Sequence, residues 1–384
     1  MKIMFLYMFP LWGNGSGAWL RKLSRSLVKR KHKIAIVSPD NRKLDGVKHF
    51  LVKPPQMGVF VGHPELKGIK KYGDMTGSEM ADIISCYIKT TAQAAQEFRP
   101  QIIHCFHTSF LPLVGRIVKV LYKSRLIITT HGSDLHYLQE DKRLIGPIRD
   151  AIRVSSYITA NSTFTRQWFI KMFGKKCSSK LRTIPAGVDL GKARGFKDIN
   201  KKYKLDGRKM VLFTGRLTVH KGVKYLIKAA RKIKGEVVIL GDGPEREYLK
   251  ELIERYDLKN VHLLGYVKES ELEMLTKFYH RADVYVAPSV WDEPLGMVIL
   301  EAMAAGTPVI CTRKGGIMSI VKDGYNGYLV RPRNSTEIAQ AVNKLFANDK
   351  LRAKMSERAK RTVENKFTWE KVTDKFERIY QKFA

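Results

Sequence analysis

Short runs rich in β-branched and apolar residues alternate along the whole chain with longer amphipathic segments. This alternation is typical of βα units and parallel sheets. In the first half the predicted strands are Lys2–Met8, Ile34–Ser38, Val47–Val52, Ile102–Phe106, Leu126–Thr130, Tyr157–Ala160 and Leu181–Ile184. In the second half they are Met210–Thr214, Glu236–Leu240, Val261–Leu264, Val284–Ala287, Pro308–Cys311 and Gly327–Val330. The pattern therefore predicts an α/β protein with two doubly wound, Rossmann-like sheets.

The apolar periodicity is interrupted at residues 189–204, where glycines and a run of lysines stand. A chain of 384 residues is long for a single core and suits two domains of about 190 residues each. We therefore expect a first domain over residues 1–190 and a second that begins at residue 191.

The chain carries a net charge of +34, from 70 basic against 36 acidic residues. Basic residues gather at 21–33 and at 116–125, where they interleave with apolar side chains. Three interpretations stay open: docking on an anionic membrane surface, which we favour, binding of nucleic acid, and an ordinary solvated exterior. The sequence contains no zinc-finger spacing, RNP-type motif or basic zipper, which disfavours nucleic acid as a partner.

No apolar run approaches the roughly 20 residues that cross a bilayer. The longest, Ile3–Trp12, contains a proline and is predicted as a buried strand. The four cysteines lack disulfide or metal-site spacing, which favours a reduced, cytoplasmic setting. Together with the basic surface, these features predict a cytoplasmic protein that is peripheral on the inner face of the cell membrane.

In doubly wound sheets ligands bind beyond the carboxyl ends of the strands, so polar and glycine-rich residues there are site candidates. The glycine-rich segment 13–17 follows the first predicted strand and leads into a helix, where backbone N–H groups can receive a phosphate. Its spacing is not the dinucleotide-binding fingerprint. His131 stands at the exit of another predicted strand, and we expect it to face the crevice.

Two cations follow the predicted strand Met210–Thr214. Arg216 comes after Gly215, and Lys221 precedes Gly222 where a helix begins. Such a pair can clamp a diphosphate, since each cation about 4 Å from a phosphate charge contributes roughly 4 kcal/mol before desolvation at an effective dielectric near 20. The alternative, two solvated surface bases, is weakened by the glycines beside them.

Residues 294–306 predict a buried helix, with its entry at Pro294 and Gly296 and its end at Gly306, in which Glu301 is the only charge. An unpaired buried carboxylate is expensive, so Glu301 requires either protein donors or the hydroxyls of a ligand. Glu293 stands just outside the same helix. We expect it to point into the crevice near the backbone N–H groups of Gly296 and Met297.

These motifs, in this order and spacing, resemble the retaining GT-B glycosyltransferases of the group-one family, also called family four. Glu293 to Glu301 resembles the family's E-x7-E motif, and 215–222 resembles its G-R-x4-K-G element. Residues 241–244 resemble its G-x-G-P turn, and 186–189 resemble the segment that closes its first domain. Residues 367–369 resemble the entry to a crossing C-terminal helix. The resemblance implies a GT-B fold with domains over 1–190 and 191–366 and a helix over 367–384 that packs back on the first.

The resemblance also implies a role for each candidate. Four are catalytic: Arg216 and Lys221 on the diphosphate, Glu293 on the sugar hydroxyls and His131 near the reacting carbon. Eight bind the donor: Gly15, Ser16, Gly215, Gly243, Tyr266, Gly296, Met297 and Glu301. Two departures from the family pattern bear on the subfamily, and therefore on the sugar: Ser319 replaces a common acid, and residues 331–334 lack another.

The expected reaction is transfer of a hexose from a nucleotide diphosphate sugar to a hydroxyl acceptor with retention of configuration. The preferred acceptor is a lipid-linked or membrane glycan. No D-x-D pair occurs in the sequence, so we expect no metal and no other cofactor, with the cations stabilising the leaving diphosphate. Two alternatives stay open: another GT-B enzyme, namely a phosphorylase or epimerase, and a catalytically silent basic adaptor on membrane or nucleic acid.

Overall fold

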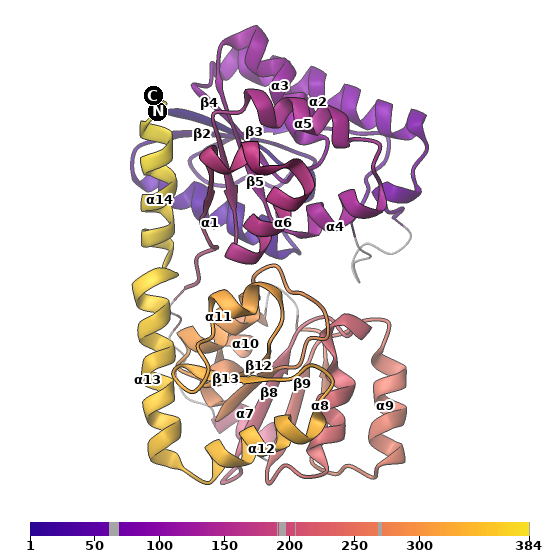
Figure 1. Cartoon of the computed structure of the whole chain (residues 1–384), viewed down its shortest axis with the longest axis vertical. Helices are drawn as coiled ribbons and strands as arrows, with labels where there is room; N and C mark the ends of the chain where they lie inside the picture. Colours follow the sequence, from indigo (N-terminus) through magenta and orange to yellow (C-terminus); the bar gives the residue numbers. More distant parts are fainter. Residues whose placement is uncertain (61–68, 190, 192–196, 204, 268–270, 384) are drawn as a thin grey trace. The chain divides into compact units, whose positions relative to one another are not determined.

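The computed structural model describes residues 1–60, 69–189, 191, 197–203, 205–267 and 271–383 (Figure 1). These residues form two compact units, one of Met1–Gly187 with Trp369–Ala384 and one of Val188–Thr368. Each unit has its own parallel sheet and its own hydrophobic core.

The sheet of the first unit has seven parallel strands in the order β3-β2-β1-β4-β5-β6-β7. The strands are β1 Lys2–Leu6, β2 Lys33–Ser38, β3 Val47–Leu51, β4 Ile102–Phe106, β5 Arg125–Thr130, β6 Tyr157–Ala160 and β7 Leu181–Thr183. Every strand predicted for the first half is present, and no end differs by more than two residues. The winding reverses between β1 and β4, which is where such sheets bind ligands.

Helices pack on both faces of this sheet, and α2, α3 and α5 contact one another in sequence order (Figure 1). The helices are α1 Gly15–Lys29, α2 Gly77–Phe98, α3 Leu111–Tyr122, α4 Ser133–Glu140, α5 Ile145–Val154, α6 Thr163–Phe173 and α14 Trp369–Gln381, with short 3₁₀ helices η1 Tyr72–Asp74 and η2 Lys175–Lys180.

The C-terminal helix α14, drawn in yellow, lies against α1 in the first unit (Figure 1). Glu377 accepts from Arg30 at 2.6 Å and pairs with His32 at 2.7 Å. The Tyr380 hydroxyl contacts His104 Nδ1 at 2.8 Å inside the core. An apolar face with a few ionic contacts therefore attaches the end of the chain to the first unit.

The sheet of the second unit has six parallel strands in the order β10-β9-β8-β11-β12-β13. The strands are β8 Met210–Thr214, β9 Glu236–Leu240, β10 Val261–Gly265, β11 Val284–Ala287, β12 Val309–Thr312 and β13 Gly327–Val330. The helices are α7 Lys197–Tyr203, α8 Val223–Ala230, α9 Arg246–Arg255, α10 Leu272–Arg281, α11 Met297–Ala304, α12 Ser335–Phe346 and α13 Asp349–Lys366, with η3 Val219–Lys221 and η5 Gly315–Ser319. The strands predicted for the second half are all present, each within one residue.

The chain passes from one unit to the other twice, and the residues of the second unit at these two points, Val188 and Thr368, are paired. Val188 and Thr368 form a backbone bridge, and the Val188 N–H donates to Phe367 at 2.8 Å. The units are therefore divided after Gly187 and after Thr368, whereas the sequence placed the divisions after residues 190 and 366. Residue 190 itself lies outside the described residues.

Candidate active site

Arg216 is placed by two glycine turns that interlock at the carboxyl ends of β8 and β9. A Cβ on Gly241 would meet the Gly215 carbonyl oxygen at 1.8 Å, so only glycine permits this approach. The Leu217 N–H donates to the Asp242 carbonyl at 2.9 Å and fixes the turns together. Arg216 is half-buried, and burial lowers the pKa of its guanidinium, which nevertheless stays cationic at neutral pH.

Lys221 ends the 3₁₀ turn η3 and reaches a carboxylate on the loop after β11. Its Nζ donates to Glu293 Oε1 at 2.6 Å. Gly222 follows with φ +65°, and a Cβ there would meet the Pro288 carbonyl oxygen at 2.2 Å. The glycine thus lets the two loops touch, and this contact brings the lysine to Glu293.

Glu293 is buried, with 9% of its surface exposed. Burial alone would raise the pKa of its carboxyl, but the charge and hydrogen bond of Lys221, with a hydrogen bond from Ser289, hold it below the usual value. The Ser289 hydroxyl donates to Oε1 at 2.7 Å, so both donors reach the same oxygen. The carboxylate is therefore an anion oriented by two fixed donors at neutral pH.

Glu301 lies on α11, a helix that Gly296 begins with φ +95°. The carboxylate accepts from the Tyr279 hydroxyl at 2.7 Å, and that hydroxyl also contacts Thr214 Oγ1 at 2.7 Å. Glu301 is only half-buried, so the expectation of a fully buried carboxylate is wrong in this respect. Of the two kinds of partner that the sequence left open, Tyr279 is a protein donor, and the sequence gave no sign of which residue this would be. Met297 is the first residue of this helix, four positions after Glu293.

The glycine pair after β12 packs against the backbone of the Glu293 loop. Gly316 N–H donates to the Glu293 carbonyl at 2.6 Å, and Gly315 N–H donates to Asp292 Oδ1 at 2.9 Å. A Cβ on Gly316 would meet the Pro294 carbonyl oxygen at 2.1 Å. The pair therefore holds the Glu293 loop in place.

Tyr266 and Gly243 lie at the same carboxyl edge. Tyr266 directly follows β10 and is 42% exposed. Gly243 follows β9, and a Cβ there would meet the Leu217 carbonyl oxygen at 2.5 Å. Both residues are thus positioned by loops that adjoin the Arg216 turn.

In the first unit, Ser16 and Gly15 begin helix α1. Asn14 caps this helix by accepting from the Gly17 N–H at 2.7 Å, and it also accepts from the Tyr7 hydroxyl at 2.6 Å. Gly17 is packed against the chain, whereas a Cβ on Gly15 would meet no described atom within 4 Å. The backbone at Gly15 is therefore open to a ligand.

His131 directly follows β5 and is 8% exposed. Burial, with the nearby His107, lowers its pKa well below the usual value, so the imidazole is neutral at pH 7. Its Nε2 has no hydrogen-bond partner among the described residues. The Asn161 amide donates to its backbone carbonyl at 2.8 Å and fixes the loop.

His107 and Asp134 complete this cluster and were missed from the sequence. The ring centroids of His107 and His131 are 4.4 Å apart with the planes tilted by 39°, and His107 Nε2 lies 3.2 Å from Ser16 Oγ. Asp134 is fully buried. Burial opposes its ionisation, but His107 and backbone N–H groups, including that of Thr108 at 2.7 Å, lower its pKa to about 2. His107 directly follows β4, so the rule that selected His131 also applied to it.

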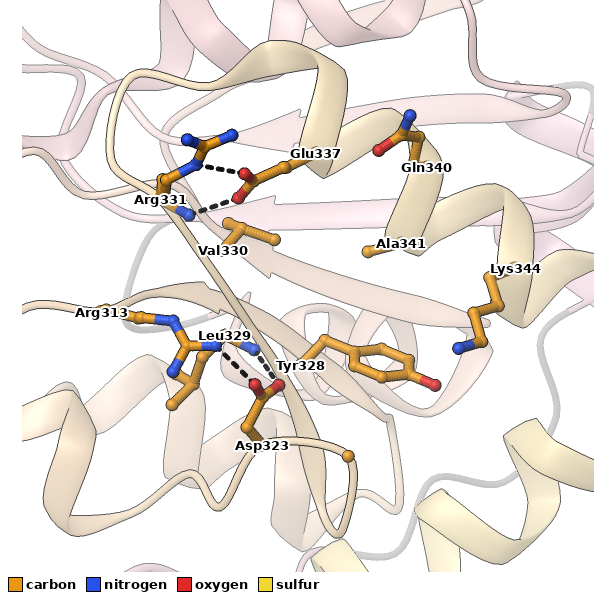
Figure 2. Close-up of a pocket in the computed structure, with 11 residues that line it drawn as sticks. Arg313, Asp323, Tyr328, Leu329, Val330, Arg331, Glu337, Gln340, Ala341 and Lys344 are labelled. Carbon is orange, nitrogen blue, oxygen red and sulfur yellow. Dashed lines mark hydrogen bonds and ion pairs between the residues drawn. The ribbon is translucent and has the colours of Figure 1, made fainter.

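A separate cavity of about 620 Å³ opens beside the edge strand β13 (Figure 2). Its two carboxylates accept from backbone N–H groups, one in that strand and one in the residue that follows it. Asp323 accepts from Leu329 N at 2.9 Å and from Arg313 at 2.6 Å, and Glu337 accepts from Arg331 N at 2.7 Å (Figure 2). These bonds protect the sheet edge from further pairing. None of the predicted site residues lines this cavity.

Comparisons with known proteins define the class. The profile "Glycosyltransferase Family 4" matches residues 13–192, and "Glycosyl transferases group 1" matches residues 196–362. The uncharacterized glycosyltransferase MJ1178 of Methanocaldococcus jannaschii is 31% identical over 283 residues, which cover 74% of this chain and 76% of that protein. The chain therefore belongs to the group 1 glycosyltransferases, and the resemblance drawn from its motifs is confirmed.

Two relatives carry more specific names. N-acetyl-alpha-D-glucosaminyl L-malate synthase of Bacillus anthracis is 26% identical over 380 residues, covering 95% of this chain and 93% of that enzyme. Lipopolysaccharide 1,2-N-acetylglucosaminetransferase of Salmonella typhimurium is 33% identical over 180 residues, covering 44% and 47%. The protein is a glycosyltransferase that uses a nucleotide sugar.

Solved structures confirm the predicted fold class. Anabaena Alr3699/HepE in complex with UDP matches with a TM-score of 0.78 at 21% identity and covers 100% of both chains. Sucrose-phosphate synthase from Thermosynechococcus elongatus matches with a TM-score of 0.78 at 21% identity, covering 99% of this chain and 98% of that one. The two parallel sheets are those of the GT-B fold. Within the part of the chain that the structure describes, no helix has the length and apolar character needed to cross a bilayer.

Proposed function

We propose that this glycosyltransferase moves a hexose from a nucleotide diphosphate sugar to a hydroxyl acceptor, retains the anomeric configuration and needs no metal ion. The observation that carries the proposal is the 2.6 Å contact between Lys221 and Glu293, beside the turn that holds Arg216. A cation for the leaving group and an anion for sugar hydroxyls thus occupy adjoining loops at the carboxyl edge of one sheet.

The leaving diphosphate gains negative charge as its bond to the sugar breaks. Arg216 presents a planar guanidinium with five donors, and the Lys221 ammonium has three, of which one is engaged by Glu293. Cations that are already in place stabilise the developing charge without reorganising during the reaction. These two side chains therefore supply the electrostatic part of the catalysis, which is the role we otherwise would assign to a metal ion.

The carboxylates bind hydroxyl groups. Glu293, with the backbone N–H groups of Gly296 and Met297, receives the hydroxyls of the sugar, and Glu301, oriented by Tyr279, receives those of the ribose. The bonds that Glu293 accepts from Lys221 and Ser289 withdraw electron density from it and favour binding over nucleophilic attack. We therefore do not propose that retention proceeds through a covalent sugar intermediate on Glu293.

In the first unit, Gly15 and Ser16 would close over the phosphates, and His131 would approach the reacting carbon. The open space at the Gly15 Cβ and the unpartnered Nε2 of His131 among the described residues support these roles. A neutral imidazole also adds no positive charge beside a sugar carbon that becomes electron-poor as its bond breaks.

The acceptor we propose is a lipid-linked or membrane glycan, used at the cytoplasmic face of the cell membrane. The net charge of +34 supports a location on an anionic surface. The Salmonella relative, whose name places it in lipopolysaccharide synthesis, supports an acceptor of this kind.

The clamp is tested with Arg216→Ala and Lys221→Ala. Lys228→Ala, at an exposed position of α8, removes an equal charge and is the matched control. We expect release of nucleoside diphosphate from UDP-, GDP- and ADP-sugars to fall about 10²–10³-fold in the first two variants and to stay unchanged in the control. Near-normal turnover of Arg216→Ala or Lys221→Ala, with the fold intact by circular dichroism, would refute the clamp.

The metal-free mechanism is tested by adding a chelator to the same reaction. Unchanged turnover is expected, and strict dependence on an added divalent ion would contradict it. The measurement also separates the enzyme from a silent adaptor, because an adaptor releases no nucleotide from any of the sugars. Absorbance of a pyridoxal phosphate in the purified protein would indicate a phosphorylase instead.

A further inference from the structure

Two basic segments were candidates for contact with an anionic surface, and the structure separates them. Two cations of the first segment, in and directly after helix α1, already bind other parts of the first unit. Arg21 is buried, donates to the Leu11 carbonyl and stacks on Trp12. Arg30 pairs with Asp374 and Glu377 at 2.6 Å each. Arg21 thus packs within the first unit and Arg30 attaches the C-terminal helix, which leaves the second segment, on α3, as the stronger candidate.

The end of helix α3 exposes two apolar side chains next to each other. Val120 is 69% and Leu121 is 65% exposed, more than any other large hydrophobic residue in the described part of the chain. Val118, on the same helix, is fully buried and holds it against the core. Leaving two large apolar side chains in water is unfavourable, so an exposed pair of this kind indicates an interaction surface.

Cations surround this pair. Residues 111–125 contain Arg116, Lys119, Lys123 and Arg125 and no acidic residue. The adjoining helix α5 ends in Arg153 and Val154, which is 37% exposed. Asp150 of α5 lies between the helices, at 3.4 Å from Arg116 and 3.5 Å from Arg153. We call Arg116, Lys119, Val120, Leu121, Lys123, Arg153 and Val154 the α3 patch.

The α3 patch lies at the edge of the sheet opposite the candidate site. Helices α3 and α5 end shortly before strands β5 and β6 begin, whereas His131 follows the carboxyl end of β5. Strand β5 has six residues, so about 20 Å separates the two edges. A partner on the patch therefore leaves the loops that carry His131, His107 and Ser16 uncovered.

We propose that the α3 patch docks on a membrane surface that carries anionic lipids. Val120 and Leu121 enter the interfacial layer, and Lys119 and Lys123 contact the headgroups. Apolar side chains set among cations match this layer, in which burial of apolar area and attraction to anionic lipid act together. The α3 patch would be the surface that brings the enzyme to a membrane acceptor. The reason for docking rests on the proposed function, whereas the docking itself does not.

The test measures binding of the full chain to vesicles of phosphatidylcholine mixed with phosphatidylglycerol, and to vesicles of phosphatidylcholine alone. One variant, Val120→Asn with Leu121→Asn, removes the apolar pair, and another, Lys119→Gln with Lys123→Gln, removes two charges. The matched controls are Leu272→Asn, at a site that is 50% exposed in the second unit, and Lys354→Gln with Lys360→Gln on α13. Unfolding temperatures show that every variant is folded.

We expect the wild type to bind only the mixed vesicles and to dissociate as salt is added. Each patch variant should bind about 10- to 30-fold more weakly, since each lysine near anionic lipid is worth about 1 kcal/mol, and the controls should bind as the wild type does. An equal loss in the α13 variant would show that net charge alone drives binding and would overturn the proposal. So would a change of oligomeric state in the Val120/Leu121 variant, since the patch would then bind a second copy. Release of nucleotide from sugars in solution, measured on the same proteins, reports the proposed function separately.

Discussion

Replacing Lys221 with alanine removes one member of a buried ion pair and leaves the other in place. Glu293 is 9% exposed, and among the described residues the side-chain hydrogen bond that it keeps is the one from Ser289. A carboxylate that loses its counterion inside a protein is strongly destabilising. The substitution should therefore lower the free energy of unfolding of the second unit, apart from its effect on catalysis.

The magnitude follows from the burial of the two side chains. Removing one partner of a fully buried pair costs about 3–5 kcal/mol. The Lys221 side chain is 29% exposed, so water screens part of the interaction, and we expect a loss of about 2–3 kcal/mol at neutral pH. Lys259→Ala is the matched control, because its ion pair with Asp257 has the same 2.6 Å distance but is 86% and 79% exposed. It should produce no measurable change.

The assay is urea-dependent hydrogen exchange, read by mass spectrometry on peptides of β8 and β11, because it reports the second unit separately from the first. The double variant Lys221→Ala with Glu293→Gln removes both charges of this ion pair, so neither position keeps a buried charge. It should therefore be more stable than Lys221→Ala alone, which gives a favourable coupling energy between the two positions.

The effect should depend on pH in a defined direction. In the wild type Lys221 holds the pKa of Glu293 below its usual value although burial opposes this. That contribution to stability is present above the usual carboxyl pKa of about 4.3 and is lost as the pH falls through the lowered pKa. In Lys221→Ala burial acts without the counterion and raises the pKa of the carboxyl. The stability gap between the two proteins should thus be largest at neutral pH. It should narrow as the pH falls, first through the raised pKa of the variant and then through the lowered pKa of the wild type.

The reasoning is refuted if Lys221→Ala is as stable as the control at neutral pH. It is equally refuted if the stability gap does not change with pH, or if the double variant loses the sum of the two single losses.

Two further predictions concern the framework of the site. Tyr279→Phe removes the hydroxyl that donates to Glu301 and contacts Thr214. We expect the protein to lose about 1–2 kcal/mol of stability and to bind nucleoside diphosphates more weakly, both measured by thermal shift with and without UDP, GDP and ADP. Equal nucleotide binding would show that Tyr279 does not position Glu301. Gly241→Ala places a Cβ 1.8 Å from the Gly215 carbonyl oxygen, so the soluble yield and the unfolding temperature should fall sharply. The control Gly73→Ala, with no described atom within 4 Å of the new Cβ, should behave as the wild type. A stable Gly241→Ala protein would show that the two turns are not in close contact.

The sequence by itself determined the strands, the fold class and the family. The central strands, such as β1, β4, β8 and β11, are short and mostly apolar runs with clear ends, because a strand buried on both faces admits few polar residues. Each motif consists of residues close together in the sequence, so its spacing can be recognised without the structure. The requirement that Glu301 have a partner was also legible, because the cost of burying a lone carboxylate depends only on its surroundings being apolar.

Only the tertiary structure decided which residues meet. Lys221 and Glu293 are 72 positions apart, and their contact depends on the order of β8 and β11 in the sheet and on the close approach that Gly222 permits. The same holds for Tyr279 with Glu301 and for His107 with Ser16. Sequence periodicity specifies which side of an element faces a core, whereas the pairing of loops at a sheet edge is set by strand order and by backbone approaches of a few ångströms, which no local pattern encodes.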